Sequence, residues 1–365
     1  MRIIGLVAGL LLIATILWDT FETVILPRRV TRRLRLTNLF YTLAWIPWSW
    51  FASHIKHLRP RETFLGVFGP LSLLVLLMLW ATGLIIGFAL VLWSTHTHLN
   101  VEGLHDDFTN YLYLSGVTFF TLGYGDVAPV STAGRFVAII ETANGFGLLA
   151  VSISYLPVLY QSFSRREASI SLLDARAGSP SSAVELLRRH RAEDTFDDLN
   201  RLLSEWEGWS ADLLESHLSY PVLCYFRSQH DNQSWLRALT TILDTCALVM
   251  VGVKGGPVWQ ARMTFAMARH ALVDIAQVLR TPPHSYSAFR PLTSEDFRRV
   301  TEKLEENRIY IPYDDATQNR LKELREMYEP YIYALSDWLM MPLPPWILPQ
   351  EAVDNWKTSA WGRIQ

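Results

Sequence analysis

Residues 64–93 form a run of thirty positions without a charged side chain, and this run limits what the chain can fold into. About 20 apolar residues in a helix already cross the ~30 Å hydrocarbon core of a bilayer. Backbone polar groups find no water inside that core, so a spanning segment must satisfy them internally, as a helix does. The run therefore predicts a membrane-spanning helix.

Two further apolar runs, residues 3–26 and 132–160, are also long enough to span a bilayer. Arg2 before the first run is compatible with a secretory signal peptide, but arginines cluster after it, where a cleavage site with small residues is expected. A retained first helix is therefore the favoured interpretation, with Asp19 and Glu22 on one face near its end. The clustered arginines are Arg28, Arg29, Arg32, Arg33 and Arg35.

The basic residues predict which ends face the cytoplasm, because loops rich in lysine and arginine stay on that side. This rule places the end of the first span and the pair Arg165–Arg166 in the cytoplasm. Residues 95–107 contain no lysine or arginine and are predicted outside; their irregularly spaced histidines favour a solvated surface over a zinc site. We expect a multi-pass protein of the cell membrane, with its N-terminus outside and its C-terminal domain in the cytoplasm.

Residues 36–53 are aromatic and apolar but short, contain Pro47, and are flanked by basic residues. Their apolar side chains fall on one helical stripe, which predicts a helix lying in the membrane surface in contact with lipid. A voltage sensor is the alternative for this arginine-rich region. Such sensors carry arginines within an apolar helix, whereas here the arginines flank the apolar runs, so we reject it.

The composition suits a chain that is half membranous and half soluble, with 50% hydrophobic residues and a mean hydropathy of +0.14. A net charge of −2 argues against nucleic acid as the main partner. The two cysteines, Cys224 and Cys246, are expected to be buried free thiols in a reducing compartment.

The stretch between the second and third spans has two unusual parts. Residues 107–120 are too short to cross the bilayer, so a re-entrant helix is expected there, capped by Asp106 or Asp107. The hexapeptide TLGYGD follows at residues 121–126, with glycines at alternate positions. Glycine adopts φ values closed to other residues, so successive carbonyls can turn to one side. Four such strands around an axis would replace the water shell of a monovalent cation.

The order helix, short helix, TLGYGD, helix resembles the pore module of potassium channels, over roughly residues 64–161. The resemblance implies that Thr121 provides its hydroxyl and carbonyl at the innermost ion site, and that Leu122, Gly123 and Tyr124 provide carbonyls above it. It further implies that Gly125 closes the outer mouth, that the Tyr124 ring packs against the pore helix, and that Asp126 is the acidic residue beyond the filter. No cofactor is expected apart from K⁺ as the permeating ion.

The last span contains several residues of interest. Gly145 lies where the family often has a glycine hinge, and Gly147 and Pro157 are also residues at which a helix can bend. Glu141 and Asn144 are unusual in an apolar helix. Two roles stay open for Glu141: it faces the cavity and concentrates cations, or it braces the back of the pore helix. Leu122 departs from the valine or isoleucine that the family more often has.

A single filter motif occurs, and a filter needs four strands, so the resemblance implies a homotetramer. The expected domains are an N-terminal transmembrane helix (1–27), a basic linker with the interfacial helix (28–62), the pore domain (63–163) and a cytoplasmic helical domain (164–365). The fold class is therefore an all-α membrane protein with a pore module and a cytoplasmic helical bundle.

The soluble half shows helical periodicity but no ligand-binding signature, so a gating ligand or partner there is unidentified. Residues 235–251 carry Arg237 and Asp244, which favours a buried core helix over a fourth span. A metal site at Glu215, His217, His230 and His270 is less favoured than ordinary core and surface roles. The other predicted helices cover residues 183–191, 196–218, 258–279, 295–307 and 316–338.

The function predicted is a potassium-selective channel that conducts passively. The alternatives are a non-selective cation channel, a potassium-uptake subunit, and a membrane-anchored enzyme or sensor with its activity in the soluble half. A potassium-uptake subunit would carry four filter-like loops in one chain, and an enzyme would need a nucleophile, metal or phosphate motif. The sequence shows neither feature.

Overall fold

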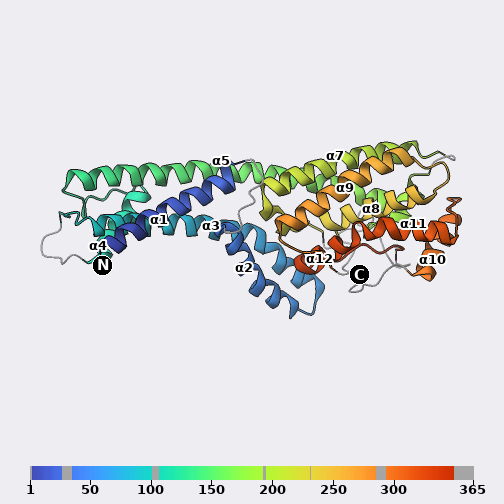
Figure 1. Cartoon of the computed structure of the whole chain (residues 1–365), viewed down its shortest axis with the longest axis horizontal. Coiled ribbons are helices and arrows are strands. Elements are labelled where there is room, and N and C mark those ends of the chain that lie inside the picture. Colours follow the sequence, from blue (N-terminus) through green and yellow to red (C-terminus); the bar gives the residue numbers. More distant parts are fainter. Residues whose placement is uncertain are drawn as a thin grey trace, which may run out of the picture. The chain divides into compact units, whose positions relative to one another are not determined.

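The computed structural model describes residues 2–26, 35–100, 107–191, 195–230, 232–284 and 293–348. These residues are predominantly helical, and the predicted all-α fold is confirmed (Figure 1). The chain divides into two compact units. Residues 1–54 and 67–160 are called the membrane unit below because they hold most of the apolar runs, and residues 55–66 and 161–365 are called the soluble unit after the sequence prediction. Arg28, Arg29, Arg32, Arg33 and Asp106 lie outside the described residues.

Among the described residues, three helices are long and apolar enough to cross a membrane, as the sequence predicts: Arg2–Ile25, Leu58–Ser94 and Thr132–Ala177. The first comprises α1 (Arg2–Thr20) and a π-helical turn, η1 (Phe21–Ile25). The second is α3 (Leu58–Ser94) and the third is α5 (Thr132–Ala177). Both α3 and α5 extend beyond their apolar runs into polar sequence, where they become part of the soluble unit. Between them lies α4 (Phe108–Phe119), which is too short to span a bilayer.

Small residues bring α1 and α3 into close contact. A Cβ at Gly87 would lie 2.7 Å from the Ile13 side chain, and one at Gly9 would lie 2.8 Å from the Gly87 carbonyl oxygen. Such small surfaces let the backbones of neighbouring membrane helices approach. The glycine pair Gly83 and Gly87 of α3 therefore serves the packing of α1.

A buried polar cluster joins α1, α2 (Leu36–Ser53) and α3. Asp19 accepts hydrogen bonds from Thr37 Oγ1 at 2.6 Å and from Trp80 Nε1 at 3.0 Å. Glu22, on the same face of the first helix, accepts from Trp18 Nε1 at 2.7 Å. A buried carboxylate needs such donors, so Asp19 fixes the start of α2 against the two spans.

The helix α2 has the bounds that its sequence pattern predicts, and its apolar stripe is exposed. Leu39, Leu43, Trp50 and Phe51 project from the membrane unit, whereas Tyr41 and Trp45 are buried. An exposed aromatic and aliphatic stripe is what a helix in the membrane surface presents to lipid.

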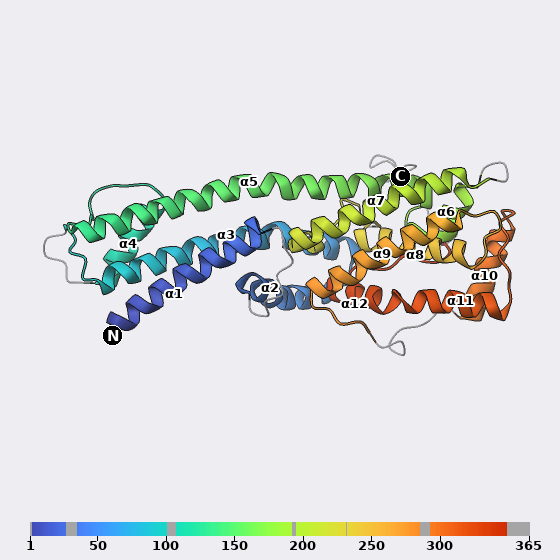
Figure 2. The ribbon, with the colours of Figure 1, turned by 45° about the horizontal axis from the view of Figure 1, so that its top comes forward.

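The soluble unit is a helical bundle around α8 (Trp235–Val251). Fifteen residues of α8 are buried, from Trp235 to Val249, which confirms a core helix and not a fourth span. Figure 2 shows α9 (Val258–Val278) beside α8 and α7 (Asp197–Ser219), and α9 packs extensively against both. The cysteines Cys224 and Cys246 are buried free thiols, as predicted.

The remaining helices of the soluble unit are shorter. They are α6 (Ala183–Arg189), the 3-10 turn η2 (Pro221–Tyr225), α10 (Ser294–Glu305), α11 (Asp315–Glu326) and α12 (Glu329–Leu339). The prediction of one helix over residues 316–338 is wrong, because the chain breaks between α11 and α12. Pro330 lies in the first turn of α12, where its missing N–H does no harm but where it cannot continue a preceding helix.

Candidate functional site

The short helix α4 has a well-defined start. Of the two predicted caps, Asp107 lies among the described residues and accepts hydrogen bonds from Thr109 N at 3.4 Å and Thr109 Oγ1 at 2.7 Å. These bonds stabilise the carboxylate and lower the pKa of Asp107. A negative charge there also interacts favourably with the positive, N-terminal end of the helix dipole.

The TLGYGD segment begins two residues after the C-terminal end of α4, which is Phe119. Leu122 N donates to Val117 O at 2.8 Å, and Thr121 N donates to Thr118 O at 3.0 Å. The segment is therefore held to the helix end by its first residues, and its position depends on that of α4.

The backbone of residues 121–125 alternates in handedness. Thr121, Gly123 and Gly125 have φ values of 57°, 58° and 78°, whereas Leu122 and Tyr124 between them do not have positive φ. Alternation of this kind turns successive carbonyls toward the same side of the strand. A left-handed conformation is cheap for glycine but strained for threonine, and such strain gathers at functional positions.

The side chains of this segment project from the chain. Leu122 is 55% exposed and Tyr124 is 69% exposed. The expectation that the Tyr124 ring packs against the pore helix is therefore not met within one chain. The physical reason is that α4 ends at Phe119 and its buried face is occupied by α3 and α5.

Two further residues hold the outer end of the segment, and the sequence pattern did not single them out. Tyr113 of α4 donates its hydroxyl to Asp126 Oδ2 at 2.8 Å. Asn100 accepts from Ala128 N at 2.6 Å through Oδ1. Tyr113 lies two turns before the TLGYGD segment, on a helix that the sequence predicts, so its place on that helix was the available signal. Asn100 offers no such signal.

Glu141 is fully buried in the membrane unit. Its Oε1 makes a short contact with Ser115 Oγ of α4, and the same Oγ lies 2.7 Å from the Ile85 carbonyl of α3. This geometry supports the brace, the second of the two roles left open for Glu141. Asn144 instead bonds within its own helix, from Nδ2 to Ile140 O at 2.8 Å.

The predicted hinge residues lie in one continuous helix, because α5 runs from Thr132 to Ala177 through Gly145, Gly147 and Pro157. At Gly145 the structure supplies a packing reason for glycine. A Cβ there would overlap the Phe119 carbonyl at the end of α4, whereas nothing lies within 4 Å of a Cβ at Gly147. Gly145 thus permits the closest approach of α5 to α4.

In the soluble unit, the continuation of α5 is anchored by Arg166. This side chain is 4% exposed, and its guanidinium donates to Leu223 O at 2.9 Å and to Phe226 O at 3.0 Å. It also lies 3.2 Å from His217 Nε2, while His217 Nδ1 lies 2.8 Å from Leu213 O. Burial and the neighbouring arginine lower the pKa of His217 well below its ordinary value, so the ring is neutral and accepts from Arg166.

The residue after Phe226 anchors the start of α3. Arg227 Nη1 lies 3.4 Å from Glu62 Oε2, and its guanidinium also donates to the Leu339 and Met340 carbonyls at the C-terminal end of α12. The segment 223–227 therefore binds α5 through its carbonyls and α3 through its arginine. Burial lowers the pKa of Arg227 to about 10, an effect that Glu62 opposes.

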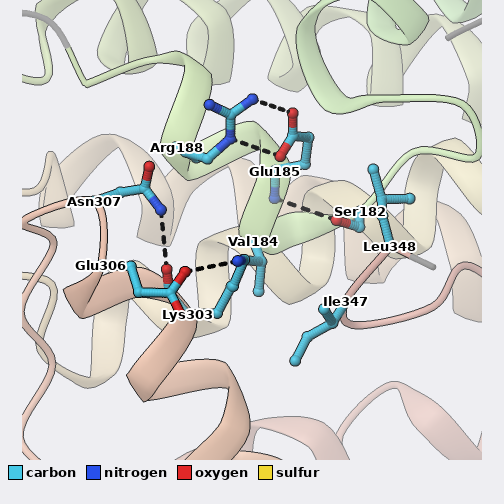
Figure 3. Close-up of a pocket in the computed structure, with 9 residues that line it drawn as sticks. All are labelled: Ser182, Val184, Glu185, Arg188, Lys303, Glu306, Asn307, Ile347 and Leu348. Carbon is cyan, nitrogen blue, oxygen red and sulfur yellow. Dashed lines mark hydrogen bonds and ion pairs between the residues drawn. The ribbon is translucent and has the colours of Figure 1, made fainter. Parts of the chain in front are cut away.

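A pocket of about 410 Å³ opens in the soluble unit between α6 and α10 (Figure 3). Its charged side chains pair with one another: Arg188 with Glu185 on α6, and Lys303 with Glu306 at the end of α10. Ile347 and Leu348 supply its apolar wall. The charges of these four side chains sum to zero.

The histidines and glutamate considered as metal ligands are not brought together. His217 contacts Arg166, and His270 lies 3.9 Å from Asp274 on α9. Across the described parts of the chain, no group of three His, Cys, Asp or Glu side chains has metal-binding geometry.

Comparison with known proteins gives the class of protein. Residues 74–161 match the family model described as an ion channel, a range that includes α4, the TLGYGD segment and the first part of α5. The fold and this match define an ion-channel pore domain in a membrane protein.

One relative is matched over most of its own length. Protein LctB of Bacillus caldotenax is 33% identical over 99 residues, which are 23% of this chain and 69% of that protein. The chain belongs to the ion-channel family that it shares with this relative and that the pore-domain model describes.

Two other relatives are matched over smaller shares of their length. The uncharacterized membrane protein YdjJ of Bacillus subtilis (strain 168) is 26% identical over 193 residues, 52% of this chain and 55% of that protein. The voltage-gated potassium channel regulatory subunit KCNG2 of Rattus norvegicus is 29% identical over 129 residues, 34% of this chain and 25% of that protein. The chain thus spans about half of the first and a quarter of the second. No solved structure matches the chain.

Proposed function

We propose that this protein is a potassium-selective channel that conducts K⁺ passively through the TLGYGD segment. The observation that carries the proposal is the alternation of positive φ at Thr121, Gly123 and Gly125, because it directs successive carbonyls to one side. Rings of backbone carbonyls replace the hydration shell of K⁺ in potassium channels. The relative named as a potassium channel regulatory subunit adds support.

The channel is proposed to be a homotetramer. One chain supplies one row of carbonyls, and a cage of oxygens around an ion needs several rows. The exposed side chains of Leu122 and Tyr124 offer surface for a neighbouring copy. Cross-linking in membranes tests this assembly: bands up to four subunits are expected, and a ladder that stops at two would overturn it.

Ion flux from liposomes tests the selectivity. Purified full-length protein should pass K⁺ and Rb⁺ far faster than Na⁺. Gly123→Ala should abolish the difference, because alanine is strained at a φ of 58°. Gly116→Ala is the matched control, since nothing lies within 4 Å of a Cβ at that position. Equal Na⁺ and K⁺ flux in the unchanged protein would favour the non-selective alternative.

The soluble unit is proposed to couple a cytoplasmic signal to the pore through segment 223–227. That segment holds the extensions of both α3 and α5, through the Glu62–Arg227 pair and the Arg166 hydrogen bonds. A cytoplasmic signal reaches this segment only if the soluble unit lies in the cytoplasm, so the proposal includes the topology with the N-terminus outside. A protein truncated after residue 170 that still forms tetramers and conducts as the full chain does would refute the coupling role.

A further inference from the structure

Glu141 is a carboxyl group in a place that is costly for a charge. It lies in the apolar part of α5, is fully buried, and its Oε2 has no hydrogen-bond partner among the described residues. An ionised carboxylate with an unpartnered oxygen in such surroundings is far less stable than a neutral acid.

The hydrogen-bond count around Ser115 points the same way. Its single hydroxyl hydrogen faces two oxygens, the Ile85 carbonyl and Glu141 Oε1. The carbonyl can only accept, so if Ser115 donates to Ile85, the contact with Glu141 is a hydrogen bond only when Glu141 donates. A neutral Glu141 therefore allows both contacts of the Ser115 hydroxyl to be hydrogen bonds, and only Glu141 Oε2 is left without a partner among the described residues.

We propose that Glu141 is a positioning residue of the filter: as a neutral acid it donates to Ser115, which donates to Ile85, so that one relay of hydrogen bonds fixes α4 between α3 and α5. This inference rests on the proposed channel function and assigns to Glu141 the support of its selectivity.

The relay acts close to the filter. Ser115 lies two residues before Val117, whose carbonyl accepts from Leu122 N. One turn further along α5, Gly145 packs against the Phe119 carbonyl at the end of the same helix. Two contacts thus join α5 to the part of α4 from which the filter begins, and loss of the polar one leaves α4 free to shift.

Isosteric replacement tests the proposal. Glu141→Gln supplies an N–H donor of the same shape, so its K⁺/Na⁺ flux ratio should stay within about twofold of the wild type, whereas Glu141→Leu should lower the ratio at least about fivefold, since it leaves Ser115 with one partner. Thr142→Val is the matched control on the neighbouring position, because the Thr142 hydroxyl donates to Ala138 O of its own helix. A Gln variant as poorly selective as the Leu variant would overturn the proposal. So would a Gln variant with lower conductance at unchanged selectivity, which indicates a cavity charge.

Infrared spectroscopy gives a readout that does not depend on conduction. The unchanged protein should show the carbonyl stretch of a neutral carboxylic acid, and Glu141→Gln should remove it. A carboxylate signal that disappears in the variant would overturn the proposal even if the Leu variant fails to fold. If the acid signal is present but K⁺ is not selected, the channel function fails while the assignment of Glu141 as a donor stands.

Discussion

Arg227 Nη1 lies 3.4 Å from Glu62 Oε2, so a residue of the soluble bundle is paired with the polar start of the helix that becomes a membrane span. Both side chains are nearly buried, at 8% and 13% exposure. Removing one partner of such a pair is costly because the other charge stays buried.

Glu62→Gln should lower the free energy of unfolding of the soluble unit by about 1.5–3 kcal/mol, the range for a hydrogen bond to a charged group. The loss stays in this range because Arg227 keeps its two carbonyl acceptors, Leu339 and Met340. Denaturant unfolding of the full chain in detergent measures it. Glu323→Gln breaks an exposed pair with Arg320 and should change stability by less than about 0.5 kcal/mol; equal losses in the two variants would contradict the prediction.

Asp244 should make the soluble unit lose stability as pH rises. Burial in α8 raises the pKa of Asp244 from 3.8 to about 7, although Tyr328 donates to it and Arg325 lies nearby. The folded state therefore holds a proton that the unfolded state has released. The stabilisation is fully present below pH 3.8, is lost as pH rises to about 7, and is constant above that value, with a total on the order of 4 kcal/mol.

Asp244→Asn isolates this effect, because the amide does not titrate. Unfolding free energies measured between pH 4 and 8 should converge or cross for the wild type and the variant, and the wild type should fall more steeply below pH 7. Parallel pH curves would show that Asp244 is not the titrating group.

Gly145→Ala should disturb the pore and Gly147→Ala should not. The added methyl group at Gly145 would overlap the Phe119 carbonyl, and overpacking of this kind costs about 1–3 kcal/mol. The K⁺ flux of the proposed channel should fall, since the TLGYGD segment begins at the end of α4. A flexible hinge would not distinguish the two glycines, because both lie in the same unbroken helix. Similar flux in both variants would therefore count against the packing role of Gly145.

The sequence predicts the membrane unit well because its helices carry strong local signals. A run without charge, a short helix capped by Asp107, and a glycine pattern are all properties of contiguous residues. The bounds of α2 and α8 also agree with their apolar patterns. Pro330 is a local signal as well, yet the periodicity on both sides of it led to a single helix being predicted.

The parts that sequence reasoning missed depend on contacts between distant residues. Arg166 follows a span and looks like an ordinary cytoplasmic charge, but its burial comes from carbonyls of Leu223 and Phe226, more than fifty positions away. The choice between the two roles of Glu141 likewise needs Ser115, which lies 26 positions earlier. No local pattern encodes either contact.

Tyr113 and Asp126 should act as a pair at the outer end of the filter. Their hydrogen bond of 2.8 Å is the link between α4 and the residue after Gly125. Tyr113→Phe removes the donor and Asp126→Asn weakens the acceptor, so each should lower the K⁺/Na⁺ flux ratio by a few fold, consistent with a bond of about 0.5–1.5 kcal/mol. The double variant should be no worse than the more damaging single variant, because the same bond is lost. Flux ratios that multiply in the double variant would show that the two residues act independently and that the bond does not hold the filter.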